Sequence, residues 1–404
     1  MDYVAEVIKH GSIRAAAKFN GVPETSFRHH YHLAEAAQKP LVEGKERMVF
    51  EDKIRNLERR LREVSEDALT AEKISSYYFN ANDKDLVEPD WVLDLGSKTG
   101  VAGVPVTTWS DWHFAEVVNP SQVEGANAFD IPIFNRRFAM LVERTIDLCE
   151  NHMTGKEYPG IIVNLGGDML SGNIHEELKN TNELEVIPAA LELAGKIAWG
   201  LRRYADYFGR VFVPCVVGNH GRNTMKPQAK NTCYTSFDWL VYKMLDAHFH
   251  PMNMDGSRAD GYDDRVHFMI PNGFDAYYRV FAHRVLLTHG DRIGSRGGDG
   301  FIGAIGPIMR GAHKLRLSYS NRGREIDTLI MGHWHNEVTL PGLRVNNCLK
   351  GYDEWAMSMR FSPTAPGQDL FFIHPKRGVT CSWPIQVEKQ DHLIESHSWA
   401  SWKE

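Results

Sequence analysis

Short apolar runs alternate with amphipathic segments between residues 91 and 373 of this 404-residue chain. Apolar runs bounded by turn residues predict buried strands, and longer segments with apolar residues at helical spacing predict helices. Strands are predicted over 104–109, 160–165, 210–217, 277–287 (two runs), 326–331, 343–349 and 370–373, the last two as antiparallel strands that complete an outer layer. Helices are predicted over 135–150, 184–208, 232–249 and 303–317. This alternation predicts an α/β fold whose sheets are covered by helices.

The first 37 residues follow a different pattern, which predicts three short helices. Ser12 is placed to cap the second helix, because serine is a favoured N-cap residue. The turn at 20–22 separates the second helix from the third, and Pro23 opens the third, where a first-turn proline is favoured. The small residues before this turn and the glycine within it suit two helices that cross closely.

The stretch from Gly11 to Glu35 resembles the helix-turn-helix of recombinase-type and bacterial regulatory DNA-binding domains. In such domains the last of three helices enters the major groove of DNA. The resemblance therefore implies DNA contacts by Glu24, Thr25, Ser26, Arg28 and His29. The alternative is a three-helix packing or dimerisation unit.

A heptad-like seam follows over residues 41–80. Its apolar positions alternate steps of four and three: Phe50, Ile54, Leu57, Leu61, Val64, Ala68 and Ala71. One interpretation is a parallel homodimer through residues 50–71 that sets two DNA-binding units side by side. The other is a single long helix packed on the following domain. We therefore expect a helix-turn-helix unit at 1–40, a heptad helix and linker at 41–80, and a catalytic domain at 81–404.

Composition narrows the class of protein. With 43% hydrophobic residues, 24% charged residues and a formal net charge of -6, the chain is typical of a globular protein rather than a basic nucleic-acid coat. Every apolar run is shorter than the roughly 18–20 residues that cross a bilayer, and the N-terminus has no signal-peptide core. The five cysteines form no Cys-x-x-Cys pair. We therefore expect reduced thiols, a cytoplasmic protein and no membrane partner.

Five of the predicted strands end in residues that bind metals or transfer protons. These residues are Asp111 and His113, Asp168, Asn219 and His220, His289, and His333 and His335. In open α/β sheets, ligands bind outside the carboxyl ends of the strands. Because side chains i and i+2 of an extended backbone point to the same side, we expect Asp111 with His113, and His333 with His335, to converge. Glycines beside these residues allow the backbones to approach closely.

The seven candidate metal ligands in this set are too many for one ion with an open coordination position, and they suit two ions. Two ions roughly 3.5–4 Å apart stabilise both the attacking and the leaving oxygen of a phosphoryl displacement. Asp168, on a middle strand, is the predicted bridge. Carboxylate oxygens and imidazoles favour manganese, iron or zinc over the ions that select thiolates.

The blocks D-x-H, G-D, G-N-H, H and G-H-x-H occur in this order within residues 104–350. This set resembles the calcineurin-like metallophosphoesterase family, whose fold is a layered α/β/β/α sandwich. The resemblance implies a first metal held by Asp111, His113, Asp168 and His335, and a second held by Asp168, Asn219, His289 and His333. It also implies that a hydroxide activated by both ions attacks phosphorus, while His220 protonates the leaving oxygen. We expect two manganese ions, with iron or zinc as alternatives.

One block departs from the family pattern. The family usually continues G-N-H with Asp or Glu, whereas position 221 is glycine. His220 therefore needs another partner to orient it. Arg222 and Lys226 follow in the same loop and could bind a substrate phosphate, with ordinary surface charge as the alternative. Two further candidate substrate ligands follow His289, namely Arg292 and Arg296.

Three functions are compatible with these features. The first is a DNA phosphodiesterase, an endo- or exonuclease, that the N-terminal unit directs to DNA. The second is a phosphomonoesterase or a nucleotide or protein phosphatase, with the N-terminal unit used only for oligomerisation. The third is a DNA-binding regulator whose metal centre is weak. Gly221 is the one feature that supports the third, and the complete ligand set argues against it. The choice of DNA rests on the appended N-terminal unit, although function is argued more safely from sites than from modules.

Overall fold

The computed structural model describes residues 1–35, 86–94, 103–152, 157–253, 257–293 and 305–388. Contacts within the chain divide it into two compact units, Met1–Asp83 and Lys84–Glu404. Two sequence predictions lie outside the described residues. They are the heptad segment with its dimer seam at 50–71, and the substrate ligand Arg296.

Three short helices form the described part of the N-terminal unit: α1 (Tyr3–His10), α2 (Ile13–Phe19) and a third helix that covers residues 24–35. Ser12 caps α2 as predicted, since its hydroxyl accepts a hydrogen bond from the backbone N–H of Ala15 at 3.2 Å. Ala16, Ala17 and Phe27 are fully buried where the three helices meet. Small alanines at this point let the helices approach closely.

The second unit contains a six-stranded sheet in which β1, β2, β3 and β4 run parallel and β10 and β11 run antiparallel to their neighbours. In spatial order its strands are β11 (Gly378–Gln386), β10 (Gly367–His374), β1 (Val104–Trp109), β2 (Ile161–Leu165), β3 (Val211–Pro214) and β4 (Val266–Met269). Every residue of β1, β2 and β3 is buried, which is typical of parallel strands covered on both faces.

A second sheet has five strands, of which β6, β7 and β9 are parallel and the edge strands β5 and β8 are antiparallel. In spatial order they are β5 (Asp275–Val280), β6 (His283–Thr288), β7 (Thr328–Met331), β9 (Leu343–Val345) and β8 (Val338–Leu340).

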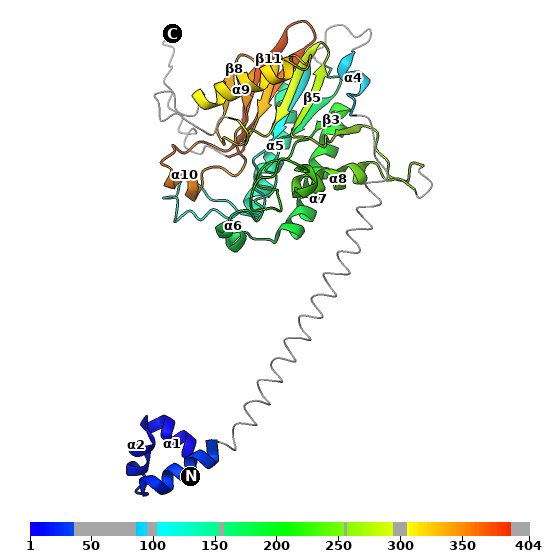
Figure 1. Cartoon of the computed structure of the whole chain (residues 1–404). Helices are drawn as coiled ribbons and strands as arrows, with labels where there is room; N and C mark the ends of the chain where they lie inside the picture. Colours follow the sequence, from blue (N-terminus) through cyan, green and yellow to red (C-terminus); the bar gives the residue numbers. More distant parts are fainter. Residues whose placement is uncertain (36–85, 95–102, 153–156, 254–256, 294–304, 389–404) are drawn as a thin grey trace, which may run out of the picture. The chain divides into compact units, whose positions relative to one another are not determined.

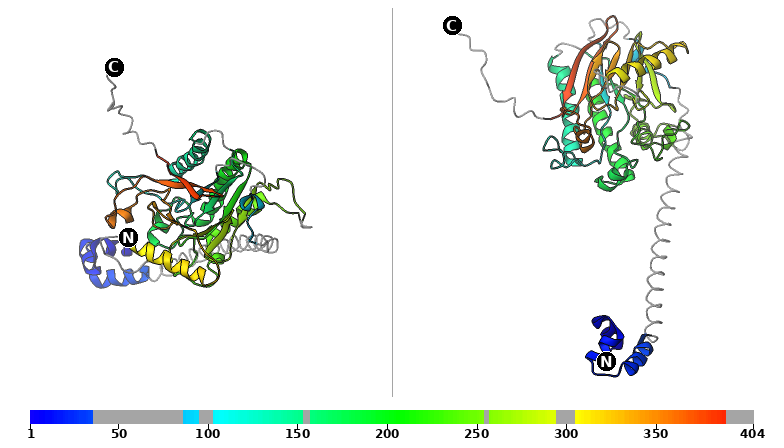
Figure 2. Two further views of the ribbon diagram at one scale, coloured as in Figure 1. Left: turned by 90° about the horizontal axis from the view of Figure 1, so that it is seen from above. Right: turned by 60° about the vertical axis from the view of Figure 1, so that its left-hand side comes forward.

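Helices cover the outer faces of both sheets. The larger ones are α5 (Ile131–Asp147), α7 (Val186–Phe208), α8 (Phe237–Phe249) and α9 (Ile305–Ser320). The shorter ones are α4 (Asp90–Leu93), α6 (Glu176–Thr181), α10 (Glu354–Ser358), a π-helical turn (Leu148–His152) and a 3-10 turn (Cys233–Thr235). Figure 1 shows α9 on one side of the sheets and α5, α7 and α8 on the other, and Figure 2 shows the same separation from two further directions.

Three separate apolar cores confirm the predicted α/β/β/α layers. The largest lies between the six-stranded sheet and α5, α7 and α8, with Trp109 and Tyr204 among its members. A second core lies between the two sheets, where Phe212 of β3 contacts Tyr278 of β5. The third lies between the five-stranded sheet and α9. Both sheets are thus fixed on two faces, which holds their strand ends in place.

The sequence prediction is wrong at two places in the sheets. The predicted strand 210–217 ends at Pro214, beyond which Cys215 still pairs with Leu165 of β2 as an isolated bridge before the chain turns into the ligand loop. The segment around 370 does not join the segment around 343 in an outer layer. It is instead part of β10, which pairs with β1 in the six-stranded sheet.

Strands β4, β8 and β11 have no counterpart in the prediction. β4 is only four residues long and interrupts its apolar pattern with His267. β11 carries Pro384, which is typical of an edge strand.

Among the described residues, no helix is both long and apolar enough to cross a membrane. All five cysteines are free thiols, and each is buried except Cys381.

Candidate metal centre

The structure brings the predicted ligands together at the carboxyl ends of β1, β2, β6 and β7 and in the loop after β3. In three groups, the candidate ligand atoms lie within 4.8 Å of one another. The groups are Asp111, His113 and His335; His113, Asp168 and His220; and Asp168, His289 and His333. Both sheets therefore contribute to one site, and Asp168 belongs to two of its groups.

Five of the predicted ligands have a left-handed backbone. They are Asp111 (φ 53°), His113 (φ 46°), Asp168 (φ 51°), His333 (φ 68°) and His335 (φ 50°). Residues other than glycine rarely adopt this conformation, and where they do they concentrate at functional sites. The predicted convergence occurs, but the predicted reason for it is wrong. The ligands converge because each lies in a tight turn beyond its strand, not because side chains alternate along an extended backbone.

The groups around Asp168 bring hydrogen-bond acceptors face to face. Nε2 of His289 lies 3.0 Å from Oδ2 of Asp168 and 3.2 Å from Oδ1 of Asn219. Nδ1 of His289 lies 2.9 Å from the carbonyl oxygen of Gly166, so the ring N–H is donated there and Nε2 presents a lone pair in the neutral ring. Oδ2 of Asp168 accepts no hydrogen bond from the neutral ring or any other described residue. A proton on His289 or a metal ion among these three atoms would satisfy Oδ2 of Asp168, and the oxygen and nitrogen donors fit a divalent metal.

The charges of this buried group reflect the same arrangement. Burial alone would lower the pKa of His289, but the neighbouring Asp168 outweighs it and holds this pKa well above its usual range. Burial alone would raise the pKa of Asp168, but His289 and His220 outweigh it and hold this pKa well below its usual range. Without a metal, a proton on His289 therefore supplies the positive charge.

The other half of the site is built around Asp111 and two histidines. The Nε2 atoms of His113 and His335 lie 3.1 Å apart, and Nε2 of His335 lies 3.5 Å from Oδ1 of Asp111. The hydroxyl of Ser110 donates to Oδ2 of Asp111 at 2.6 Å, and the backbone N–H of His333 donates to Oδ1 at 2.8 Å. Asp111 is therefore held by residues of both sheets.

His220 finds a partner other than the missing residue-221 carboxylate. Its Nδ1 lies 3.0 Å from the carbonyl oxygen of Ser171, and its backbone N–H donates to Oδ1 of Asp168 at 2.6 Å. The ring is 4.4 Å from that of His113, centroid to centroid. Burial lowers the pKa of His220 to about 4, although the charge of Asp168 opposes the shift. The carbonyl thus fixes the ring without adding a negative charge.

A buried cluster of charges behind His113 was not predicted. Oε2 of Glu116 lies 3.5 Å from Nδ1 of His113, and Nζ of Lys350 contacts Glu116 at 2.9 Å and Asp353 at 2.6 Å. All three charged side chains are buried. Glu116 follows His113 by three residues, which is a weak local signal, but nothing in the sequence links Lys350 to this site.

Gln368 and Asp238 also support the ligand loops without having been predicted. Oε1 of Gln368 accepts hydrogen bonds from the backbone N–H of Ser110 at 3.0 Å and from the indole N–H of Trp112 at 3.1 Å. Trp112 is itself fully buried in the largest core. Burial raises the pKa of Asp238 to about 6, while backbone N–H groups of Gly218 and Asp168 oppose the shift.

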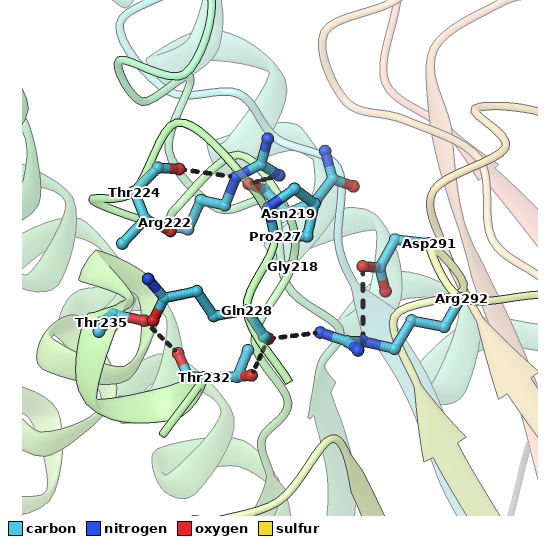
Figure 3. Close-up of a pocket in the computed structure, with 10 residues that line it drawn as sticks. All are labelled: Gly218, Asn219, Arg222, Thr224, Pro227, Gln228, Thr232, Thr235, Asp291 and Arg292. Atoms are coloured by element: carbon cyan, nitrogen blue, oxygen red, sulfur yellow. Dashed lines mark hydrogen bonds and ion pairs between the residues drawn. The ribbon is translucent and has the colours of Figure 1, made fainter. Parts of the chain in front are cut away.

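Two of the predicted substrate ligands, Arg222 and Arg292, line a small cavity with Gly218 and Asn219 (Figure 3). The guanidinium of Arg222 donates to the backbone carbonyls of Thr224, Asn219 and Met225, so it holds its own loop together. The guanidinium of Arg292 lies 3.8 Å from the centre of the Phe274 ring and donates to the carbonyl of Gln228. Lys226 is exposed in the same loop.

In the N-terminal unit, the predicted DNA-contacting residues lie together on the exposed side of the third helix. Thr25, Ser26, Arg28 and His29 are exposed, whereas Phe27 between them is buried. Arg28 pairs with Glu24 at 2.8 Å. Over residues 1–35, four Lys or Arg residues are balanced by four Asp or Glu residues. Any DNA contact here would therefore depend on local rather than overall charge.

Comparison with protein-family models and with curated proteins finds no match. Two of the solved structures that the chain is similar to are the vacuolar protein sorting 29 of Cryptosporidium parvum and a conserved uncharacterized protein, described as a predicted phosphoesterase, from Streptococcus pneumoniae TIGR4. The first is 12% identical, with 70% of this chain and 98% of that chain covered and a TM-score of 0.25. The second is 8% identical, with 70% and 99% covered and the same TM-score of 0.25. The function proposed below therefore rests on the geometry of the site.

Proposed function

We propose that this protein is a divalent-metal-dependent phosphoesterase that hydrolyses phosphodiester bonds of DNA. The observation that supports it most is the convergence of Asp168, Asn219 and His289, whose oxygen and nitrogen atoms together suit a divalent cation. The second group, around Asp111 and His335, adjoins it and supplies ligands for a second ion. Two ions held in adjacent groups suit phosphoryl transfer, in which both the attacking and the leaving oxygen carry charge.

In this proposal, some side chains of the site bind the metal ions and His220 transfers a proton. Divalent ions bound here would polarise the phosphoryl oxygens and lower the pKa of water. Asp168 would contribute to both metal sites, because it groups with His289 and His333 on one side and with His113 on the other. His220 donates its Nδ1–H to Ser171, so Nε2 is the atom that can give a proton to the leaving oxygen. A bound phosphate would raise the low pKa of His220, since a nearby negative charge favours the protonated ring.

The choice of DNA as substrate rests on the N-terminal unit. Its third helix exposes Thr25, Ser26, Arg28 and His29 on one side, where hydroxyl, guanidinium and imidazole groups could contact phosphates and base edges. A homodimer through residues 50–71 would present two such helices and raise the effective affinity for DNA. Manganese is the expected ion.

The test is a hydrolysis assay on the full-length protein with added manganese. The substrates are a small phosphodiester, a small phosphomonoester, single-stranded DNA and double-stranded DNA. We expect cleavage of DNA and of the diester, and loss of both in the His113→Ala variant. His313→Ala, which removes an exposed histidine of α9, is the matched control and should retain full activity.

Three outcomes would contradict the proposal in different ways. Cleavage of the monoester without DNA cleavage would indicate a phosphatase. DNA binding without any hydrolysis would indicate a regulator with a weak metal centre. Equal cleavage by wild type and His113→Ala would show that the site described here is not the active site.

A further inference from the structure

The carboxylate of Asp238 lies between the loops that carry Asp168 and Asn219. Its Oδ2 accepts hydrogen bonds from the backbone N–H of Asp168 at 3.0 Å and of Gly218 at 2.9 Å. Its Oδ1 accepts a third from the N–H of Met169 at 3.3 Å. The side chain is fully buried. One carboxylate therefore holds the backbones of two metal-ligand loops at a fixed separation.

This arrangement is unusual for an acidic residue in the first turn of a helix. Such residues commonly accept hydrogen bonds from the free N–H groups of their own helix. Asp238 is the second residue of α8, yet its three hydrogen bonds all go to the ligand loops. The N-cap residue Ser236 makes no capping bond with its side chain either. The Asp238 carboxylate therefore bonds to the metal-ligand loops rather than to the backbone of its own helix.

Gly221 leaves the space that this carboxylate occupies. A Cβ atom at position 221 would lie 2.7 Å from Cγ of Asp238 and 2.9 Å from each of its carboxylate oxygens, closer than real Cβ atoms approach. The two backbones are also tied together, because the N–H of Phe237 donates to the carbonyl of Gly221 at 2.7 Å. A side chain at 221 and the Asp238 carboxylate therefore compete for the same space.

We propose that Asp238 is a positioning residue of the metal centre, which sets the spacing of Asp168 and Asn219, and that residue 221 is glycine to make room for it. Asp238 takes the space that a side chain at 221 would need, whereas the ring of His220 is oriented by the carbonyl of Ser171. The inference rests on the metal site of the proposed function, but it concerns metal affinity and does not require that the reaction be hydrolysis of DNA.

The first experiment measures manganese binding to the full-length protein by calorimetry, without substrate. Asp238→Asn keeps the shape of the side chain but turns an amide NH2 toward one of the three N–H donors. We expect manganese affinity to fall by about tenfold or more, as is typical when a residue that orients metal ligands is lost. Asp246→Asn is the matched control, because Asp246 is also a buried carboxylate of α8 but pairs with His250.

The second experiment moves the carboxylate from position 238 to position 221, to test whether the two side chains compete for the same space. Gly221→Asp should weaken manganese binding by steric conflict, and Asp238→Ala by loss of the three hydrogen bonds. In the double variant the new carboxylate can turn into the vacated space, so we expect at least a tenfold recovery of affinity over Gly221→Asp. Circular dichroism and the unfolding midpoint identify any variant that fails to fold.

The outcomes separate this inference from the proposed function. Unchanged manganese affinity in folded Asp238→Asn, equal losses in Asp238→Asn and Asp246→Asn, a double variant no better than Gly221→Asp, or a wild-type protein that binds no manganese would each overturn the role of Asp238. If wild type binds manganese but hydrolyses no phosphoester, the proposed function fails. Weaker binding by Asp238→Asn, together with recovery in the double variant, would in that case still support the positioning role.

Discussion

The metal-ligand loops and the N-terminal helices differ in how firmly their candidate functional residues are held. In the loops, Asp111, His113 and Asp168 are buried, left-handed in backbone and hydrogen-bonded to neighbouring strands or loops. On the third helix, Thr25 and Arg28 are exposed, and Arg28 contacts only the Glu24 carboxylate among described side chains. A function can be inferred for the ligand loops because a left-handed backbone and buried charges cost free energy and therefore indicate a role. The exposed residues of the third helix carry no such indication.

The largest expected effect is that of Asp168→Asn. This change removes the charge shared by two ligand groups, and we expect phosphoester hydrolysis to fall about a thousandfold or more. That loss exceeds the roughly 10–100-fold typical of residues that only orient a metal ligand. Steady-state rates at saturating manganese provide the measurement, with Asp246→Asn as control. A loss of hydrolysis of less than tenfold in a folded variant would show that Asp168 is no more important for the reaction than an exposed surface residue.

His220→Gln sharpens the contrast within the site. A general acid typically contributes about 10²–10⁴ to the rate. We expect a loss in this range for substrates with poor leaving groups and a much smaller one for p-nitrophenyl esters, whose leaving group needs no proton. The measurement is the loss of kcat in the variant relative to wild type, compared between the two substrate types. Equal losses for both would assign His220 to metal binding, in agreement with its place in the group with His113 and Asp168.

The pH dependence of metal binding should follow His289. Because Asp168 holds the pKa of His289 well above its usual range, this ring is protonated in the metal-free protein at neutral pH. A metal must displace that proton, so affinity falls as pH falls, by about tenfold per pH unit below this pKa for one proton. Calorimetry in two buffers of different ionisation enthalpy counts the protons released. In His289→Gln one proton fewer should be released, and an unchanged count would contradict this assignment.

The smallest effect is expected in the N-terminal unit. Combined Thr25→Ala and Arg28→Ala changes should weaken DNA binding by about tenfold or less and reduce its salt dependence, because few phosphate contacts are lost. Hydrolysis of a small diester should stay unchanged. Lys18→Ala, which removes an exposed charge of α2, is the matched control. If the control weakens DNA binding as much as the paired change, the third helix is not the DNA-contacting element.

The strand ends could be predicted because each ligand has glycine or an apolar run beside it. Val104–Trp109 and Ile161–Leu165 end where the sequence predicts. The same local pattern places Asp111, Asp168 and His289 at one edge of the layers. The left-handed backbone could not be predicted, since single residues such as His113 adopt it only under constraints from several strands.

The supporting residues could not be predicted because they act over long distances in the sequence. Asp238 bonds the backbone of Asp168 from 70 residues away, and Lys350 reaches Glu116 from 234 residues away. No local periodicity records such contacts. The partner of His220 is a backbone carbonyl, for which side-chain identity gives no signal.

The contact between Gln368 and the first ligand loop has a consequence for biosynthesis. Gln368 lies in β10, 258 residues after Ser110, and fixes the loop that carries Asp111 and His113. Contacts between residues so distant in sequence form only after both segments have left the ribosome. The nascent chain therefore displays every metal-ligand residue before β10 can fix the first ligand loop. The metal-ligand loops are therefore fixed as described only once β10 has been made and has paired with β1.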